Sequence, residues 1–517
     1  MTPPYRDGST NTSLPGSRGE PVGTEFFAQK AALDCFFRGT PVQWSATAAA
    51  DGRGRRRVPM GAKVRGKDGF YSQLIHLVVP IALQNFMLAL VSVTDAVMLG
   101  RLDQQSMASV SQAGNVQFFL NLLVTGFSIG VGIMAAQYWG KGDGKSIEKI
   151  APSGLKIILL LGGGMTLAAL IFPTGLMRVL TSDETLIPLG AEYLRYVAPS
   201  YFLCGITQVY FALLKNTGNT TQSSLISSVA VVVNIILNAV LIFGLLGAPA
   251  MGIRGAAVAT VISRAVELAL AAGVTLRRGN VQLRWKGLLE RADRVLLRDF
   301  MHYTMPVIGA SLVWGVAYMS YSVVLGHMNG DAVAANSICA VARNLISCVI
   351  RGMGGGAGIM IGNLLGASLL DRAKSYALRL TKLAALVGVC TGAVLVALTP
   401  VIMGITELTP QAAEYLKGMI AFTGLNLAVQ SVNHVVLDGI FGAGGDARFD
   451  MNTNIIFMWC ICVPLSLLAA FRWHLSAPVV FCLCNMDEII KLPVVIVHYR
   501  KYVWLRNITR ETEVRDN

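Results

Sequence analysis

The sequence predicts an all-α polytopic membrane protein, with twelve transmembrane helices in two six-helix bundles related by a parallel repeat. Of its 517 residues, 54% are hydrophobic and only 14% are charged, and the mean hydropathy is +0.56. Soluble domains carry about 25% charged residues. Apolar stretches also recur at lengths near the roughly 20 residues that cross a bilayer core. A third observation is that the two halves of the chain repeat each other in register.

The apolar stretches begin near residue 70 and continue almost to the C-terminus. Several exceed the minimum length, so tilt or kinks are expected. Pro80 and Pro306 lie inside the first and seventh stretches, where we expect them to bend the helices. The predicted spans are 73–99, 112–139, 150–173, 189–214, 222–246, 252–275, 300–327, 333–365, 373–404, 412–441, 452–471 and 475–499.

The region before the first span has a different composition. Residues 1–70 are rich in Gly, Pro, Ser and Arg, and we expect them to form a disordered basic tail. They contain no apolar core of a signal peptide, and Met60 is an alternative start. The remaining predicted parts are an N-terminal lobe at 71–275, a cytoplasmic linker at 276–299, a C-terminal lobe at 300–500 and a cytoplasmic tail at 501–517.

Basic residues set the expected orientation. The net charge of +14 is spread over short clusters between apolar stretches, which follows the positive-inside pattern and argues against a nucleic-acid partner. We therefore expect a multi-pass protein of the plasma (inner) membrane with both termini in the cytoplasm. Besides the linker, the loops assigned to the cytoplasmic side contain Lys141, Lys145, Lys149, Lys215, Arg372, Lys374 and Arg448.

The internal repeat keeps a constant offset, 306 − 80 = 226, between matched positions of the two halves. "GIM" at 132–134 meets "GIM" at 358–360, and "GN" at 218–219 meets "GD" at 445–446 with an offset of 227. Six helices per half return the chain to the same side, so the lobes are expected to be parallel repeats about an axis along the membrane normal. The matched pairs of single residues are Pro80 with Pro306, Gly100 with Gly326, Gly126 with Gly352, and Gly140 with Gly366.

Asp95 is the acidic residue that most needs an explanation, because a charge within a bilayer costs at least about 2.5–3.5 kcal/mol. Asn234 and Asn238 lie one turn apart on the fifth span, and Thr260 lies on the sixth at a similar depth. One carboxylate, two amides and a hydroxyl are thus predicted to converge. Oxygen ligands of this kind suit Na⁺, with Asp95 and Asn234 as its ligands, and a desolvated carboxylate can instead hold a proton.

A purely structural alternative also fits these residues. In it, Asn234 and Asn238 form hydrogen bonds between helices, and Asp95 is hydrated near the surface. The second lobe favours the functional interpretation, because position 95 + 226 = 321 is Tyr321. An acid that only stabilised the repeat would be expected in both lobes.

The C-terminal lobe has its own polar residues. Arg351 either faces a central cavity or bonds to carbonyl groups near the adjacent glycines, and Arg343 lies closer to the outer end. Ordinary ion pairs are expected for Arg264 with Glu267, for His434 with Asp438, and for Asp487–Glu488 with Lys491. The residues predicted to line a substrate cavity are Gln84, Gln117, Tyr321, Arg351 and Asn433.

Enzyme and cofactor signatures are lacking. The chain has no P-loop spacing, so ATP is not expected to drive it directly. Cys460 with Cys462, and Cys482 with Cys484, have C-x-C spacing inside apolar runs, which indicates buried thiols rather than a metal site. We expect no enzyme activity and no cofactor.

Several motifs together resemble multidrug and toxic compound extrusion (MATE) transporters. They are "TDAVMLGRL" ending at 102, "NIILNAVLIFG" at 234–244, "MGIRGAAVAT" at 251–260, "GIFGAGGDARF" at 439–449 and "DEIIKLPVVIVHYRKYVWLRNIT" at 487–509. The resemblance implies two bundles around a central cavity, alternating access, and efflux driven by inward Na⁺ or H⁺. It also implies that Asp95 is the essential acid of the first helix and Asn234 the amide beside it.

The chain departs from the family pattern in its second lobe. Trp314 stands where some members have a glutamate, and Gly442 where arginine is usual. Some members also have an acid in the tenth helix, and Asn433 is the polar residue of this chain nearest to that position. These departures leave the coupling ion open.

We therefore predict a secondary active exporter, a monomer, that moves amphipathic, cationic compounds across a lipid bilayer. Cation occupancy at Asp95 would change the cost of bending the helix that contains Pro80. One alternative is a flippase for a lipid-linked anionic precursor, motivated by Arg343 and Arg351. The other is a polytopic membrane enzyme.

Overall fold

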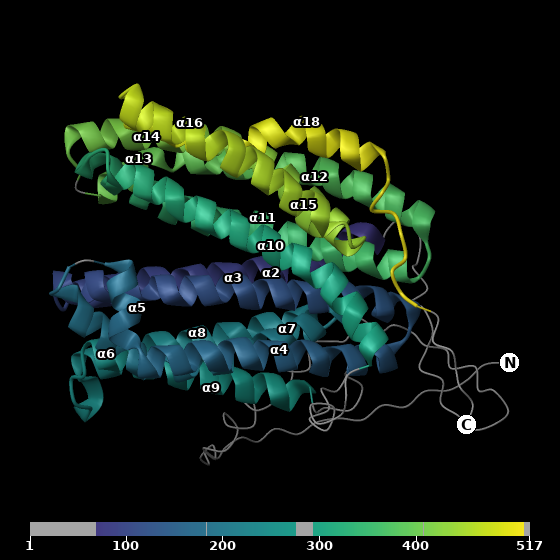
Figure 1. The fold of residues 1–517 in the computed structure, drawn as a ribbon, viewed down its shortest axis with the longest axis horizontal. Helices are drawn as coiled ribbons and strands as arrows, with labels where there is room; N and C mark the ends of the chain where they lie inside the picture. The colour runs from purple at the N-terminus through teal and green to yellow at the C-terminus, as the bar shows by residue number, and fades with distance from the viewer. Residues whose placement is uncertain (1–68, 182, 276–292, 407, 511–517) are drawn as a thin grey trace, which may run out of the picture. The chain divides into compact units, whose positions relative to one another are not determined.

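In a computed structural model of the protein, every regular element of the described residues is a helix (Figure 1). The described residues all fall within one compact unit, Arg55–Asn517. They are 69–181, 183–275, 293–406 and 408–510.

The N-terminal lobe contains α2 to α9. Its helices α6 and α7 together make one bent span, with an angle of 47° between them where Pro199 begins the second. The elements are α2 (Gly69–Gly100), α3 (Gln104–Lys141), α4 (Gly144–Ile171), α5 (Pro173–Leu180), α6 (Leu186–Val197), α7 (Pro199–Asn216), α8 (Thr220–Phe243), η1 (Leu245–Gly247) and α9 (Ile253–Thr275).

The C-terminal lobe contains α10 to α18, and three of its segments are π-helical. The elements are α10 (Arg294–Gly326), α11 (Gly330–Gly366), α12 (Leu370–Ala397), α13 (Thr399–Ile405), α14 (Pro410–Asn433), η3 (His434–Phe441), α15 (Ala447–Asn454), η4 (Ile455–Cys462), α16 (Val463–Leu467), η5 (Leu468–Arg472), α17 (Ala477–Cys484) and α18 (Asp487–Arg500).

In the described residues the helices supply up to eleven membrane spans by length and composition. Ten are single helices long and apolar enough to cross a membrane, and the bent pair α6–α7 is an eleventh. The predicted twelfth span, 475–499, coincides with α17 and α18, which follow each other across a break at 485–486. The predicted fold class is therefore confirmed, with two spans broken rather than continuous. Both α2 and α10 continue as helices through Pro80 and Pro306.

The predicted ends and linker lie largely outside the described residues. These are 1–68 of the predicted tail, 276–292 of the predicted linker and 511–517. The last part of the predicted linker is helical, because α10 begins at Arg294. Asp293 caps this helix by accepting hydrogen bonds from the backbone N–H groups of Val295 and Leu296 at 3.0 and 3.4 Å.

The repeat predicted from the sequence reappears in the local structure. Asp103 caps α3 by accepting from the N–H of Ser106 at 2.6 Å, and Asn329, its match in the second half, caps α11 by accepting from the N–H of Ala332 at 2.7 Å. Gly218 and Gly445, the pair at offset 227, both adopt left-handed backbone with φ of 88° and 72°. That conformation favours glycine, which explains why both turns contain it.

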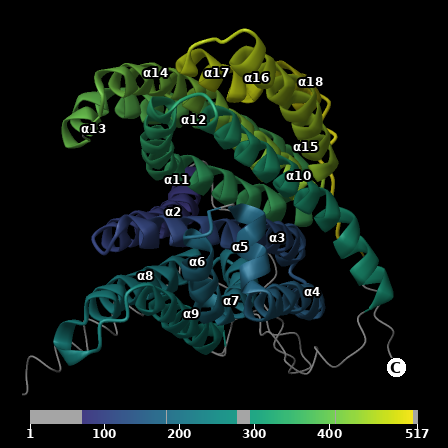
Figure 2. The ribbon, with the colours of Figure 1, turned by 60° about the vertical axis from the view of Figure 1, so that its left-hand side comes forward.

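The lobes meet at the end of the bundle that carries the Lys141, Lys215, Arg372 and Arg500 side chains, here called the basic end. Two buried apolar clusters mix residues of both lobes: one includes α3 and α10, and the other includes α2 and α11. The remaining clusters each belong to a single lobe. Accordingly, α2 lies between α8 of its own lobe and α11 of the other (Figure 2).

Matched glycines form the closest contacts of this junction. A Cβ atom on Gly140 of α3 would lie 2.1 Å from the carbonyl oxygen of Asn363, and one on Gly366 of α11 would lie 1.8 Å from that of Gln137. Gln137 and Asn363 are themselves a matched pair of the repeat. The two contacts are therefore related by the repeat, and both require glycine because backbone meets backbone.

The same relation holds one layer deeper in the bundle. A Cβ on Gly126 would lie 2.9 Å from Ile308 of α10, and one on Gly352 would lie 2.8 Å from Ala82 of α2. Ala82 and Ile308 again occupy matched positions of the repeat. We call Gly126, Gly140, Gly352 and Gly366 the glycine seam, and it explains why glycines dominate the repeat.

The chain beyond α18 crosses this junction. Residues 501–510, here called the strap, return toward α3, and Trp504 within them is buried. The N–H of Ile508 donates to Oε1 of Gln137 at 2.8 Å, while Nε2 of Gln137 donates to the carbonyl of Ala443 at 2.7 Å. One buried glutamine of the N-terminal lobe thus binds both the strap and the C-terminal lobe.

Candidate functional site

Asp95 lies in the last two turns of α2, half-buried and turned toward α8. Nδ2 of Asn238 donates to Oδ1 of Asp95 at 2.6 Å. The ion pairs formed by the described residues do not include Asp95. A carboxylate within the apolar span is therefore held by an amide rather than by a cationic side chain.

The hydrogen bonds continue from Asp95 across α8 to α9. Nδ2 of Asn238 also lies 3.2 Å from Oδ1 of Asn234, and Nδ2 of Asn234 donates to Oγ of Ser263 at 3.4 Å. Both asparagines are buried. Their spacing of four residues places them on one face of α8, as the sequence predicts. The structure thus brings together Asp95, Asn234 and Asn238.

Thr260 takes a lesser part in this arrangement. Its hydroxyl donates to the carbonyl of Ala256, one turn earlier, at 2.9 Å. Its own carbonyl accepts from the hydroxyl of Ser263 at 2.9 Å. Thr260 is therefore connected to the asparagines only through Ser263.

Two residues near Asp95 were not found by sequence reasoning. Ser263 lies one turn after Thr260 on α9, and this spacing could have predicted that its hydroxyl lies on the same face of the helix as Thr260. Tyr193 of α6 packs against the apolar cluster of Leu99 and Ile242 and interacts electrostatically with Asp95. Tyr193 lies on α6, which is bent by 47° relative to α7 where Pro199 begins the second helix.

One buried oxygen at this site has no hydrogen-bond donor. Oδ1 of Asn238 is buried and accepts no hydrogen bond. An unsatisfied buried acceptor costs about 1–3 kcal/mol. A carboxylate beside a free amide oxygen is a ligand set that suits a small hard cation, and a proton on the carboxylate is the other way to neutralise it.

Arg264 and Glu267 lie further along α9, toward the basic end. Nη1 of Arg264 donates to Oε2 of Glu267 at 2.7 Å, and Glu267 is buried. The predicted ion pair is present. Arg264 also interacts electrostatically with Asp95, although the two side chains do not form an ion pair.

The predicted cavity residues lie on five different helices, α2, α3, α10, α11 and α14. Gln84 and Tyr321 are buried, each with a side-chain oxygen that has no hydrogen-bond partner, while Gln117 bonds to Asn121 on its own helix. Arg351 donates to the carbonyl of Asn344 on its own helix at 2.9 Å, seven residues earlier and away from the adjacent glycines of the structural alternative. A cavity role for these side chains stays a prediction.

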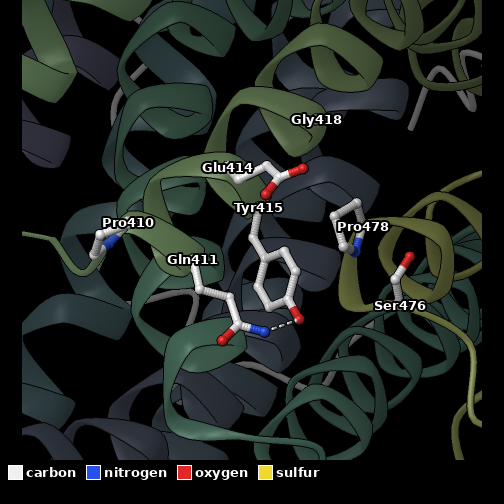
Figure 3. Close-up of a pocket in the computed structure, with 7 residues that line it drawn as sticks. All are labelled: Pro410, Gln411, Glu414, Tyr415, Gly418, Ser476 and Pro478. Atoms are coloured by element: carbon white, nitrogen blue, oxygen red, sulfur yellow. Dashed lines mark hydrogen bonds between the residues drawn. The ribbon is translucent and has the colours of Figure 1, made fainter.

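A pocket of about 680 Å³ opens at the starts of α14 and α17, at the end opposite the basic end (Figure 3). Within it, Nε2 of Gln411 donates to the hydroxyl of Tyr415 at 2.8 Å. None of the predicted cavity residues lines it. The lining residues are Pro410, Gln411, Glu414, Tyr415, Gly418, Ser476 and Pro478.

A sequence model of the MatE family matches residues 80–240 and 306–468, which together make up more than half of the chain. The chain belongs to the MatE family. The two matched segments start at Pro80 and Pro306, so the family match contains the internal repeat. MatE proteins are membrane transporters of small molecules, and this chain is accordingly a multi-pass transporter.

Curated relatives and solved structures are similar over most of this MatE chain. The uncharacterized transporter YisQ of Bacillus subtilis is 21% identical over 84% of this chain and 95% of its own length. A probable multidrug resistance protein NorM of Bradyrhizobium diazoefficiens is 25% identical over 79% of this chain and 88% of its own. A MOP superfamily transporter from Pyrococcus furiosus is similar in fold, with a TM-score of 0.76, 18% identity, and coverage of 83% of this chain and 95% of its own.

Proposed function

We propose that this MatE chain is a secondary active multidrug exporter. It moves amphipathic, cationic compounds out of the cell in exchange for Na⁺ or H⁺ that moves inward. The protein lies in the plasma membrane, with both termini in the cytoplasm. One of the named relatives, NorM of Bradyrhizobium diazoefficiens, is a probable multidrug resistance protein, which supports the multidrug part of this proposal.

The coupling role of Asp95 rests on one observation. Its carboxylate lies in an apolar span and accepts a hydrogen bond from Asn238, and the buried Oδ1 of the same asparagine has no hydrogen-bond donor. In the cation-free state this site carries a net negative charge in a region where charge is costly. Binding Na⁺ or a proton neutralises that charge, so the free energy of the site depends on the ion.

The contacts between the lobes suggest how ion binding changes access. In the described residues the glycine seam and the strap hold the basic end closed. With the basic end in the cytoplasm, this state faces outward. Export then requires the seam to open while the opposite end closes, with ion occupancy at Asp95 biasing the two states.

The flippase alternative has less support from the side chains that suggested it. Arg343 donates to Oδ1 of Asn485 and to the hydroxyl of Tyr318, both at 2.9 Å, and Arg351 bonds to its own helix. Neither guanidinium is held ready for an anionic headgroup. Cell-wall defects on deletion, with unchanged drug sensitivity, would favour the flippase. Product formation by purified protein without transport would favour an enzyme.

The test is efflux of ethidium from cells that express the chain. Asp95→Asn keeps the shape of the side chain but removes its charge, and it should reduce efflux to the background rate. Asp183→Asn is the matched control, because Asp183 is an exposed carboxylate between α5 and α6 that caps a turn through Thr185. Equal amounts of each variant in the membrane should be confirmed. Wild-type efflux by Asp95→Asn would remove the proposal.

A further inference from the structure

The strap consists of two parts that contact different lobes. Its proximal part, 501–507, follows α18 directly and is packed into the C-terminal lobe. Trp504 is fully buried, and its ring stacks on that of Tyr499 near the end of α18, with 5.9 Å between the ring centroids. A Cβ atom on Gly444 would lie 2.0 Å from the carbonyl oxygen of Trp504, so the strap backbone lies directly on the turn between η3 and α15. The distal part, 508–510, continues to the N-terminal lobe.

Four side-chain hydrogen bonds fix the proximal part to the C-terminal lobe. Nε and Nη2 of Arg506 donate to the carbonyl oxygens of Gly444 and of the residue after it, both at 2.9 Å. Nδ2 of Asn507 donates to the carbonyl oxygen of Gly366 at 3.3 Å and to Oγ of Ser368 at 3.0 Å. The proximal part is thus bound to the turn before α15 and to the end of α11.

The N-terminal lobe holds the distal part through a single turn of α3. Oε1 of Gln137 accepts a hydrogen bond from the N–H of Ile508 at 2.8 Å. The hydroxyl of Tyr138 accepts one from the N–H of Arg510 at 3.3 Å, and Nζ of Lys141 donates to the carbonyl oxygen of Arg510 at 2.6 Å. The side chain of Ile508 is buried in the mixed apolar cluster of α3 and α10. Three neighbouring side chains of one helix therefore hold the end of the strap.

The same turn of α3 is part of the glycine seam. Gly140 lies within it and meets the backbone of α11, so separating α3 from α11 moves this turn away from the C-terminal lobe. The proximal part stays behind, because it is continuous with α18 and has its own bonds. Arg510 adds a link to that lobe, since its Nη2 donates to Oδ1 of Asp299 on α10 at 2.8 Å. The contacts that break on opening are therefore those between the strap and α3, including the 3.4 Å bond from Nε2 of Gln137 to the carbonyl of Arg506.

We propose that the strap is a latch for the closed basic end. It moves with the C-terminal lobe and releases the last turn of α3 each time the basic end opens, with the release point between Asn507 and Ile508. The inference rests on the proposed alternating access, and it adds the segment that stabilises one of the two states. A contact present only in the closed state shifts the equilibrium toward that state. A chain without the distal part should therefore be open more often.

Cross-linking tests which lobe the strap leaves. Lys141→Cys with Arg510→Cys joins the distal part to α3, and Ser368→Cys with Asn507→Cys joins the proximal part to the turn after α11. Both double variants are made in a chain whose nine native cysteines are replaced. They are reconstituted in proteoliposomes and treated with a short bis-methanethiosulfonate, whose disulfides dithiothreitol reduces. The first cross-link should reduce export of a cationic dye to the background rate, with recovery after reduction. The second is the matched control and should leave export at the rate before cross-linking.

Two results of this experiment would overturn the latch. Export that survives the cross-link between the strap and α3 would show that this contact does not have to break. Export lost through the cross-link at Ser368 would show that the strap leaves the C-terminal lobe instead. A lack of export before cross-linking would count against the proposed exporter, and the distance measurement below then decides on the latch alone.

A distance measurement tests the latch without transport. Spin labels at Lys145 on α4 and Arg372 on α12, which are exposed and belong to different lobes, report the separation of the lobes at the basic end. Ending the chain after Asn507 removes the distal part and should raise the ratio of open to closed molecules by about fivefold or more. Ending it after Arg510 keeps every contact described above and should match the full chain. Equal distance distributions in the two truncated chains would overturn the proposal.

Discussion

Replacing Gly366 by alanine should open the junction between the lobes at the basic end. The added Cβ would lie 1.8 Å from the carbonyl oxygen of Gln137 and 2.5 Å from its carbonyl carbon. A normal C···O contact is about 3.3 Å, so α3 and α11 must separate by roughly 1.5 Å. Overpacking of this kind costs about 1–3 kcal/mol. If the open state is free of the clash, the ratio of closed to open molecules falls by about 5- to 150-fold.

The assay is a distance measurement between two spin labels at the basic end. Lys145 at the start of α4 and Arg372 at the start of α12 are exposed and belong to different lobes. The labels require a background in which the nine native cysteines are replaced. Gly366→Ala should add a population at longer distance. Gly273→Ala, at an exposed helical glycine with nothing within 4 Å of the added atom, is the control. The same distance distribution in both variants would refute the role of the seam.

Sequence reasoning could predict the features that depend on spacing along the chain. The register of the repeat predicted that Gly140 and Gly366 occupy matched positions of the two lobes. Likewise, the four-residue spacing of Asn234 and Asn238 placed both amides on one face. Their convergence with Asp95 followed from equal depth in helices that run in the same direction.

Features that depend on which helices face each other could not be predicted in this way. The glycines gave no sign that they join the two lobes rather than helices of one lobe. Near Asn433 and Asn454 the π-helical segments η3 and η4 change the helical period, so extrapolation at 3.6 residues per turn fails there. In the strap, the apolar Trp504 and Ile508 within a basic segment were the available signal, and both are buried.

Three further substitutions give distinct expectations. Gln137→Leu leaves the N–H of Ile508 and the carbonyl of Ala443 without hydrogen-bond partners, which costs about 1–3 kcal/mol each. The Tm should therefore fall, and trypsin should cut the strap faster than in the wild type. Unchanged cleavage would contradict the contacts of the strap. Arg510→Ala removes the ion pair between Asp299 and an exposed guanidinium, where water weakens the attraction. Its Tm should therefore stay close to that of the wild type, and a large drop would show that the pair matters more than the exposure of Arg510 suggests. Asn238→Ala removes the amide beside Asp95. A loss of about 1.4 kcal/mol of binding free energy lowers affinity tenfold, so the apparent affinity for the coupling ion in transport assays should fall about tenfold. An unchanged affinity would show that Asn238 does not take part in ion binding.

Transport by the purified protein under imposed ion gradients tests the central claim most directly. Purified chain in proteoliposomes is given an inward Na⁺ gradient or an inward H⁺ gradient, each imposed alone, and export of a cationic dye is followed. We predict that one of the gradients drives export by the wild type and that neither drives export by Asp95→Asn. Export by Asp95→Asn at the wild-type rate, under the gradient that drives the wild type, would contradict coupling through this carboxylate.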